Sequence, residues 1–148
     1  MIKEMTIDLD GNSNLVANVR MIVDPPLDVL ITYELFYWSA RKPERKKLLA
    51  EFGTNFQDHD DFFWLVNPDN PSEGLASHEG RVIHVEAIVN SIRETEAEFA
   101  IALELYQEND HIVEGKTPFD VLTSELKKIN VFSGDQFVTL RVVLKTGS

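Results

Sequence analysis

The length, composition and charge of the chain bound the kind of protein that it can be. Its 148 residues suit a single domain over residues 1–148, and 43% hydrophobic with 26% charged residues is the balance of a globular protein. The net charge of −11 opposes binding to nucleic-acid phosphates, and the lack of cysteine excludes disulfides and thiolate chemistry. No apolar run approaches the roughly 20 residues that a membrane helix needs, and residues 1–11 lack the apolar core of a secretion signal. We therefore expect a cytoplasmic protein that binds neither nucleic acid nor membranes.

Alternation of apolar and polar residues with a period of two predicts strands along most of the chain. The clearest runs cover residues 15–23, 27–38, 61–66, 81–89, 97–106 and 136–144. The run over 27–38 is β-rich on both sides and is predicted to be a central strand. In four other runs, the apolar residues that share a face are Leu15, Ala17, Val19, Met21 and Val23, then Ile83, Val85, Ala87 and Val89, then Phe99, Ile101, Leu103 and Leu105, and lastly Val138, Leu140, Val142 and Leu144. We expect these four faces to lie in the core.

Two shorter strands are predicted beside turns. Residues 107–110 include Asn and Asp, which tolerate turn conformations, and they lead into a short strand at residues 111–115. A second short strand at residues 130–132 precedes a Ser-Gly-Asp turn at residues 133–135. The chain therefore carries at least seven predicted strands, counted from these runs.

Two segments break the strand pattern and predict short helices. In residues 117–130, a candidate cap at Thr117 precedes Pro118 at the favoured first helical position, and three apolar residues recur at helical spacing. In residues 42–53, a proline near the start and a glycine at the end are typical helix boundaries, but the apolar Leu48, Leu49 and Phe52 fit an extended segment equally well. The basic run at residues 41–47, which overlaps the start of that segment, fits either a helix or a loop.

This order of elements predicts the fold class. Many short strands with at most two helices favour two antiparallel sheets packed face to face. A parallel α/β fold would need helices that alternate with strands, and the sequence lacks them. We therefore predict a mainly all-β protein, an antiparallel β-sandwich of about seven to nine strands with one or two short helices.

The sequence carries no recognisable catalytic motif. It has no GxSxG, GxGxxG, P-loop or HExxH pattern, so we assign no catalytic residue and expect a non-enzymatic protein. Two of its histidines have ordinary interpretations on strands. His84 falls opposite the core-facing positions and is expected to be a surface imidazole beside Glu86, and His111 opens a predicted strand.

The stretch DHDD at residues 58–61 is the strongest candidate for a metal site. Its carboxylates Asp58, Asp60 and Asp61 surround His59, and His78 lies in the loop that follows the next strand. Calcium prefers oxygen ligands from carboxylates, carbonyls and water, which such loops provide. The alternative is an acidic loop that only solvates the start of a strand.

Aromatic residues offer a second type of candidate site. A platform of this kind could stack sugars or dock a peptide, whereas the ordinary interpretation is packing within the sheets. The residues concerned are Tyr33, Tyr37, Trp38, Trp64 and Tyr106.

The order of several segments resembles a known family. The succession LDVLITYELFYW, DDFFWLVNPDNPSEGLASHEG, RVIHVEAIV, FAIALELY and KTPFDVL is similar to that of the TerD-type tellurium-resistance and stress proteins, from Asp28 to Leu122. The resemblance implies a β-sandwich. It also implies a bacterial cytoplasmic protein that binds calcium and acts in stress responses through protein partners.

The resemblance also assigns individual positions. Asp28 falls on the first Asp of the family's first motif, and Asp61 and Asn67 fall on the Asp and the last Asn of the second. The family's acidic, glycine-rich segment has no counterpart between Gly80 and Arg81, so a sandwich that has lost the ion fits the sequence equally well. The candidate metal ligands are Asp28, Asp58, His59, Asp60, Asp61, Asn67 and His78.

Three functions follow as hypotheses. The first is a non-enzymatic binding or scaffold domain, related to stress, that presents loops at one end to a divalent ion or a protein partner. The second is a structural subunit of a larger assembly, such as a phage or secretion-type particle, in which edge strands of identical copies pair. The third is a carbohydrate-binding or small-molecule-binding domain or enzyme that uses the aromatic residues.

Overall fold

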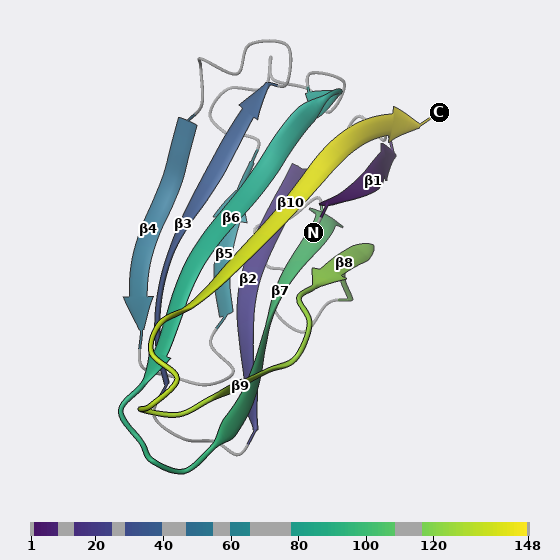
Figure 1. Ribbon diagram of the computed structural model, residues 1–148. Helices are drawn as coiled ribbons and strands as arrows, with labels where there is room; N and C mark the ends of the chain where they lie inside the picture. The colour runs from purple at the N-terminus through teal and green to yellow at the C-terminus, as the bar shows by residue number, and fades with distance from the viewer. Residues whose placement is uncertain are drawn as a thin grey trace.

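The computed structural model is built almost entirely of strands (Figure 1). The structure describes residues 2–8, 14–24, 29–39, 47–54, 60–65, 78–108 and 117–147. In chain order the strands are β1 (Ile2–Asp8), β2 (Asn14–Asp24), β3 (Val29–Ser39), β4 (Lys47–Thr54), β5 (Asp60–Trp64), β6 (Arg81–Ser91), β7 (Ala97–Glu108), β8 (Asp120–Thr123), β9 (Lys127–Ile129) and β10 (Gln136–Gly147). Within these ranges no helix is long and apolar enough to cross a membrane.

The strands form two sheets that face each other. Sheet A has the order β1-β10-β6-β3-β4, and sheet B has the order β5-β2-β7-β8, with β9 also paired to β7. In Figure 1, sheet A lies in front and sheet B behind. The pairs between described strands are antiparallel, except that β1 runs parallel to β10. The chain is a β-sandwich, which confirms the predicted fold class.

The core lies between the two sheets and is filled by the faces that the alternation predicts. The four predicted apolar faces on β2, β6, β7 and β10 are all buried, and Phe99, Ile101, Leu103 and Leu105 are fully so. On β3, the residues Ile31, Tyr33, Leu35 and Tyr37 face the same core. Period-two patterning identifies the core of this sandwich because each buried strand presents only one face to it.

The helix predicted over residues 117–130 is wrong, because that segment forms β8 and β9. Both strands pair with β7, and Leu122 and Ile129 are buried against the core. Leu126, which the helical spacing placed beside Leu122, is instead exposed. The unpaired backbone groups of β7 need partners, and this pairing overrides the local helical preference.

Of the two alternatives for residues 42–53, the helix is wrong and the extended segment is correct for the part that the structure describes. Residues 47–54 form β4, which pairs with β3 at the edge of sheet A and contains a register irregularity opposite Leu35 and Phe36. The remaining part of that segment, and the strand predicted at residues 111–115, lie outside the described residues.

Two further differences from the predicted elements concern β1 and the residues between β9 and β10. β1 lacks a strict alternation and is not predicted, yet it buries Met5 and Ile7 in the core, and Lys3 Nζ bridges to Asp120 Oδ1 on β8 at 2.6 Å. The strand predicted at residues 130–132 is instead the start of a turn. The turn itself spans residues 130–133, where the Ser133 N–H donates to the Asn130 carbonyl at 3.2 Å, so it begins before the turn predicted at residues 133–135. Gly134 has a φ of 70°, which favours glycine.

Candidate binding face

The outer face of sheet A carries side chains of β3, β6 and β10 that point away from the core. The strand register sets them in three neighbouring rows across the sheet. The first row is Thr32, Ile88 and Phe137, the second is Glu34, Glu86 and Thr139, and the third is Phe36, His84 and Arg141. Because directly opposite residues on paired strands share a face, each row brings three different strands together at the surface.

Arg141 and His84 of the third row and Glu86 of the second row form a hydrogen-bonded chain. Arg141 Nε donates to His84 Nδ1 at 3.2 Å, and His84 Nε2 lies 2.8 Å from Glu86 Oε1. An arginine can only donate, so Nδ1 accepts and the ring proton is on Nε2, which donates to Glu86. The chain of bonds therefore fixes both the His84 tautomer and the orientation of the Glu86 carboxylate.

Aromatic and basic side chains cover His84. The His84 ring lies 5.6 Å from the Trp38 ring and 6.1 Å from the Phe36 ring, centroid to centroid. The Arg141 guanidinium lies 5.5 Å from the Trp38 ring centroid, within the range of a cation–π contact. His84 is only 3% exposed, so the expected pairing with Glu86 is confirmed but the expected surface position of the imidazole is wrong.

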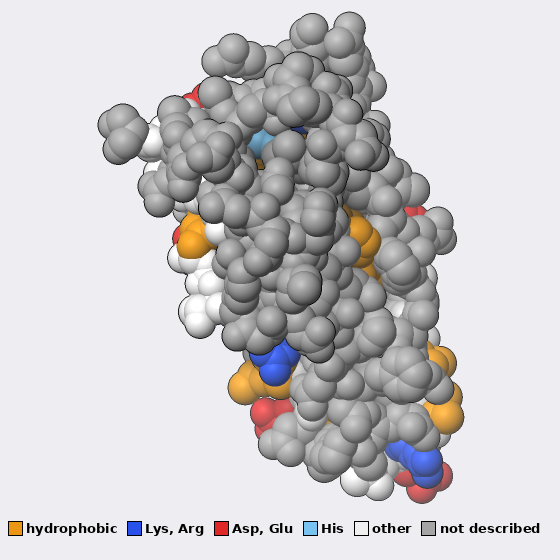
Figure 2. All heavy atoms as spheres, turned by 180° about the vertical axis from the view of Figure 1, so that it is seen from behind, with side chains coloured by type: hydrophobic (Ala, Val, Ile, Leu, Met, Phe, Trp, Pro, Cys, Tyr) orange, Lys and Arg blue, Asp and Glu red, His pale blue; other side chains and the backbone are white. Residues whose placement is uncertain are grey.

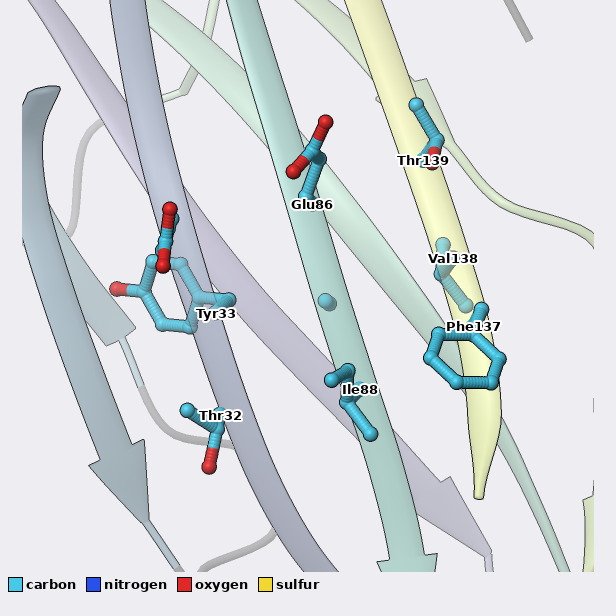
Figure 3. A pocket seen from close by; sticks show the side chains of 9 residues that line it. Thr32, Tyr33, Glu86, Ile88, Phe137, Val138 and Thr139 are labelled. Atoms are coloured by element: carbon cyan, nitrogen blue, oxygen red, sulfur yellow. The ribbon is translucent and has the colours of Figure 1, made fainter.

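A groove lies between the first two rows (Figure 3). Its volume is about 290 Å³, and β3, β6 and β10 all contribute to its lining. Figure 3 shows Glu86 and Ile88 on β6 between Thr32 on β3 and the pair Phe137 and Thr139 on β10. One half of the lining, the row with Glu34 beside Glu86, is therefore acidic, and the other half, the row with Ile88 beside Phe137, is mainly apolar. Each row also contains one threonine.

The apolar half of this groove is exposed to solvent. Phe137 is 65% exposed and Ile88 is 41% exposed, and the two are paired across β10 and β6. Strands with one solvated face normally carry polar residues there. An exposed aromatic and an exposed isoleucine side by side next to carboxylates are typical of a surface that contacts another molecule.

The three predicted metal ligands that the structure describes lie at two different sheets. Asp60 and Asp61 belong to β5 in sheet B, where they pair with Arg20 and Val19 of β2. His78 instead lies just before β6 of sheet A. The other four, Asp28, Asp58, His59 and Asn67, lie outside the described residues. Among the residues that the structure does describe, no group of three or more His, Cys, Asp or Glu comes together.

His78 is fully buried beside an aromatic ring and a cation. The centroid of its ring lies 5.5 Å from the centroid of the Tyr37 ring. The Arg81 guanidinium lies 5.2 Å from the centroid of the same Tyr37 ring. Within the described ranges neither ring nitrogen of His78 has a hydrogen-bond partner. Burial, with a smaller contribution from the Arg81 charge, lowers the pKa of His78 to about 4. The imidazole is therefore neutral at physiological pH.

Hydrogen bonds hold the turn after His78 against β10. Glu79 accepts from both the backbone N–H and the hydroxyl of Thr146, and the Gly80 N–H donates to the Leu144 carbonyl at 2.9 Å. Gly80 has a φ of 73°, a conformation that side chains disfavour. These contacts position His78 at the start of β6.

A second group of polar residues is buried on the outer face of sheet B. Glu104 Oε1 accepts from Asn18 Nδ2 at 2.8 Å and from the Tyr106 hydroxyl at 3.3 Å. Arg20 Nη1 lies 4.0 Å from Glu104 Oε2. Asn18 and Glu104 are register partners on β2 and β7, so this network links the two longest strands of the sheet. Buried polar groups that bond one another in this way mainly specify strand register.

The sequence alone predicts neither the Asn18–Glu104 network on sheet B nor the Glu34–Glu86 pair on sheet A. Asn18 and Arg20 are visible only as interruptions of an apolar run, and Glu104 is visible only as a residue opposite the core positions. Likewise, Glu34 and Glu86 are far apart along the chain and become neighbours through the register of β3 and β6. Like charges at outward positions of two predicted strands are the one signal that points to the groove.

Comparisons of the chain with protein-family models, with curated proteins and with solved structures find no significant match.

Proposed function

We propose that the chain is a non-enzymatic binding domain and that its partner-binding surface is the outer face of sheet A. The observation that carries the proposal is the groove between Glu34, Glu86, Ile88 and Phe137, which combines exposed apolar side chains with carboxylates. Binding surfaces of this type have an apolar centre that excludes water and polar groups that set specificity.

The side chains beside the groove support binding because they are already in place. The Arg141–His84–Glu86 hydrogen bonds and the contacts with Trp38 hold one side of the groove in a single arrangement. A partner that docks on this face therefore loses little free energy to ordering these side chains. The groove also lies on strands of the sandwich instead of on loops, which favours a well-defined binding geometry.

A displayed random peptide library, panned against the immobilised chain, tests the proposal. We expect the selected peptides to lose binding to the variants Phe137→Ser and Ile88→Ser. They should keep binding to Phe132→Ser, which removes an exposed aromatic that lies in the turn before β10. A library that yields no binder, or binders that ignore Phe137→Ser and Ile88→Ser, would contradict the proposal.

A second candidate function is self-assembly, and the apolar end of the sandwich favours it. Phe132 is 77% exposed, and Asn130 Oδ1 accepts the backbone N–H groups of Phe132 and Ser133, so the turn holds this ring in solvent. Ile92 is also exposed. It lies near Phe132, because the N–H of Val131, the residue before Phe132, donates to the carbonyl of Arg93, the residue after Ile92, at 2.7 Å. At the end of the molecule drawn lowest in Figure 2, hydrophobic side chains lie beside charged ones.

Sedimentation velocity distinguishes the two candidates. An assembly subunit should sediment as larger species as its concentration rises, and Phe132→Ser should return it to a monomer. A binding domain should remain a monomer over the same range. The stress-related role and the relation to TerD-type proteins are proposals that rest on the sequence resemblance. The cytoplasmic location and calcium binding are proposals that rest on the residues of the sequence as well as on the resemblance.

A further inference from the structure

We infer that the groove on sheet A receives an arginine or lysine side chain from an extended segment of a partner protein. The inference rests on the proposed function and specifies the chemistry of the partner. It follows from the two halves of the groove, which match the charged end and the aliphatic stem of a long basic side chain.

The acidic half of the groove comes from carboxylates placed directly opposite one another. Glu34 on β3 is the register partner of Glu86 on β6, and both line the groove. Like charges directly opposite in a sheet are unfavourable, so the fold gains nothing from this arrangement. A bound cation would convert the repulsion into attraction.

The His84 hydrogen bond prepares Glu86 for such a cation. His84 donates to Oε1 of Glu86, and the Glu86 side chain is 54% exposed. The carboxylate is thus oriented from within the sheet while remaining accessible from the groove. A guanidinium binds carboxylates through two parallel N–H groups, and this geometry requires a carboxylate of fixed orientation.

The apolar half of the groove fits the rest of a basic side chain. Ile88 and Phe137 lie one row away from Glu34 and Glu86, which is about 7 Å along each strand. Lysine and arginine place their aliphatic stems on apolar surface while the charged end stays in polar surroundings. A volume of about 290 Å³ suits one long side chain with part of its neighbours.

The same lining disfavours a calcium ion and a nucleic acid as ligands of the groove. A calcium ion needs six to eight oxygen ligands, and an apolar wall formed by Phe137 and Ile88 supplies none. A nucleic acid would bring phosphates to a pair of carboxylates on a chain of net charge −11. An extended peptide brings the cation together with apolar neighbours that reach Phe137.

Two synthetic peptides test the inference by a single change of charge. One has the sequence Val-Arg-Val-Arg-Val with blocked ends, and the other replaces each arginine by citrulline, its neutral analogue. By fluorescence titration we expect the arginine peptide to bind at least about tenfold more tightly, a difference of about 1.4 kcal/mol. The preference should fall as salt concentration rises.

The variant Glu34→Gln/Glu86→Gln identifies the groove as the source of this preference. Glutamine at position 86 can still accept the His84 hydrogen bond, so the variant is expected to fold, which circular dichroism checks. The variant should bind both peptides equally, whereas Glu94→Gln, which removes an exposed charge in the β6–β7 loop, should keep the preference for arginine.

Equal binding of the two peptides to the parent chain, binding of neither peptide, or a preference that survives in Glu34→Gln/Glu86→Gln would each overturn the inference. None of these results would affect the proposed function, which is judged by library-selected peptides and the variant Phe137→Ser. The two failures are therefore distinguishable.

Discussion

Glu34 and Glu86 are register partners on β3 and β6, so two carboxylate side chains lie directly opposite each other on the outer face of sheet A. This pair costs stability, because like charges in opposed positions repel. The variant Glu34→Gln is therefore expected to raise the free energy of unfolding by about 0.5 kcal/mol at low salt. Urea denaturation at low and high salt measures the gain, which should shrink as salt screens the repulsion.

The matched control is Glu94→Gln, which makes the same change of net charge in an exposed loop. It is expected to change stability much less than Glu34→Gln does. An equal gain in both variants would mean that overall charge, and not the Glu34–Glu86 pair, sets the effect.

The buried His78 should make the stability of the protein depend on pH. Its pKa is lowered from 6.5 to about 4 by burial and by Arg81, so the unfolded chain takes up a proton at a higher pH than the folded chain does. The contribution of neutral His78 to the free energy of unfolding is complete above pH 6.5 and is lost as the pH falls from 6.5 to about 4. By linkage the loss is on the order of 3 kcal/mol across that window.

Urea midpoints of the parent and of His78→Gln, measured at several pH values across this window, test the expectation. Glutamine does not titrate, so the difference between the two curves isolates His78 from the carboxylates of the chain. The variant should lose less stability on acidification. Parallel curves would show that His78 takes up its proton equally well in the folded state.

Glu104 is expected to contribute to stability through its buried hydrogen bonds. The variant Glu104→Ala removes the acceptor of Asn18 and of the Tyr106 hydroxyl, and it should lower the free energy of unfolding by about 1–3 kcal/mol. Glu98→Ala is the control, because Glu98 is an exposed residue on the same strand. Similar losses in both variants, measured by chemical denaturation, would contradict a structural role for the network.

The calcium site predicted from DHDD has its own test. If Asp58, His59, Asp60 and Asp61 bind calcium, millimolar calcium should raise the melting temperature after chelation, because a ligand that binds only the folded state stabilises it. The double variant Asp60→Asn/Asp61→Asn should lose the rise, and Asp135→Asn, an exposed Asp→Asn change before β10, should keep it. An unchanged melting temperature of the parent chain would eliminate this site.

The strands and the core could be predicted from the sequence because their signal is local. Phe99, Ile101, Leu103 and Leu105 alternate with smaller or polar residues, and the structure buries all of them. The two predicted helices fail for a non-local reason. Leu122 and Leu126 have helical spacing, but the open edge of β7 recruits their segment as strands.

The binding face could be predicted only in part, because its residues meet through strand register. Alternation correctly places Glu86 on the outer face, and it also places His84 there. It does not predict that Trp38 and Arg141 cover His84, since these residues come from other strands. Nor does it predict that Glu34 lies opposite Glu86, which depends on how β3 and β6 align.

Nuclear magnetic resonance of the isotope-labelled chain, titrated with a library-selected peptide, tests the central claim most directly. Amide signals of β3, β6 and β10 around Glu34, Glu86 and Phe137 are expected to shift or broaden on binding. Signals of β2 and β7 in sheet B should remain unchanged. Shifts confined to sheet B, or to the turn around Phe132, would contradict the assignment of the outer face of sheet A as the binding surface.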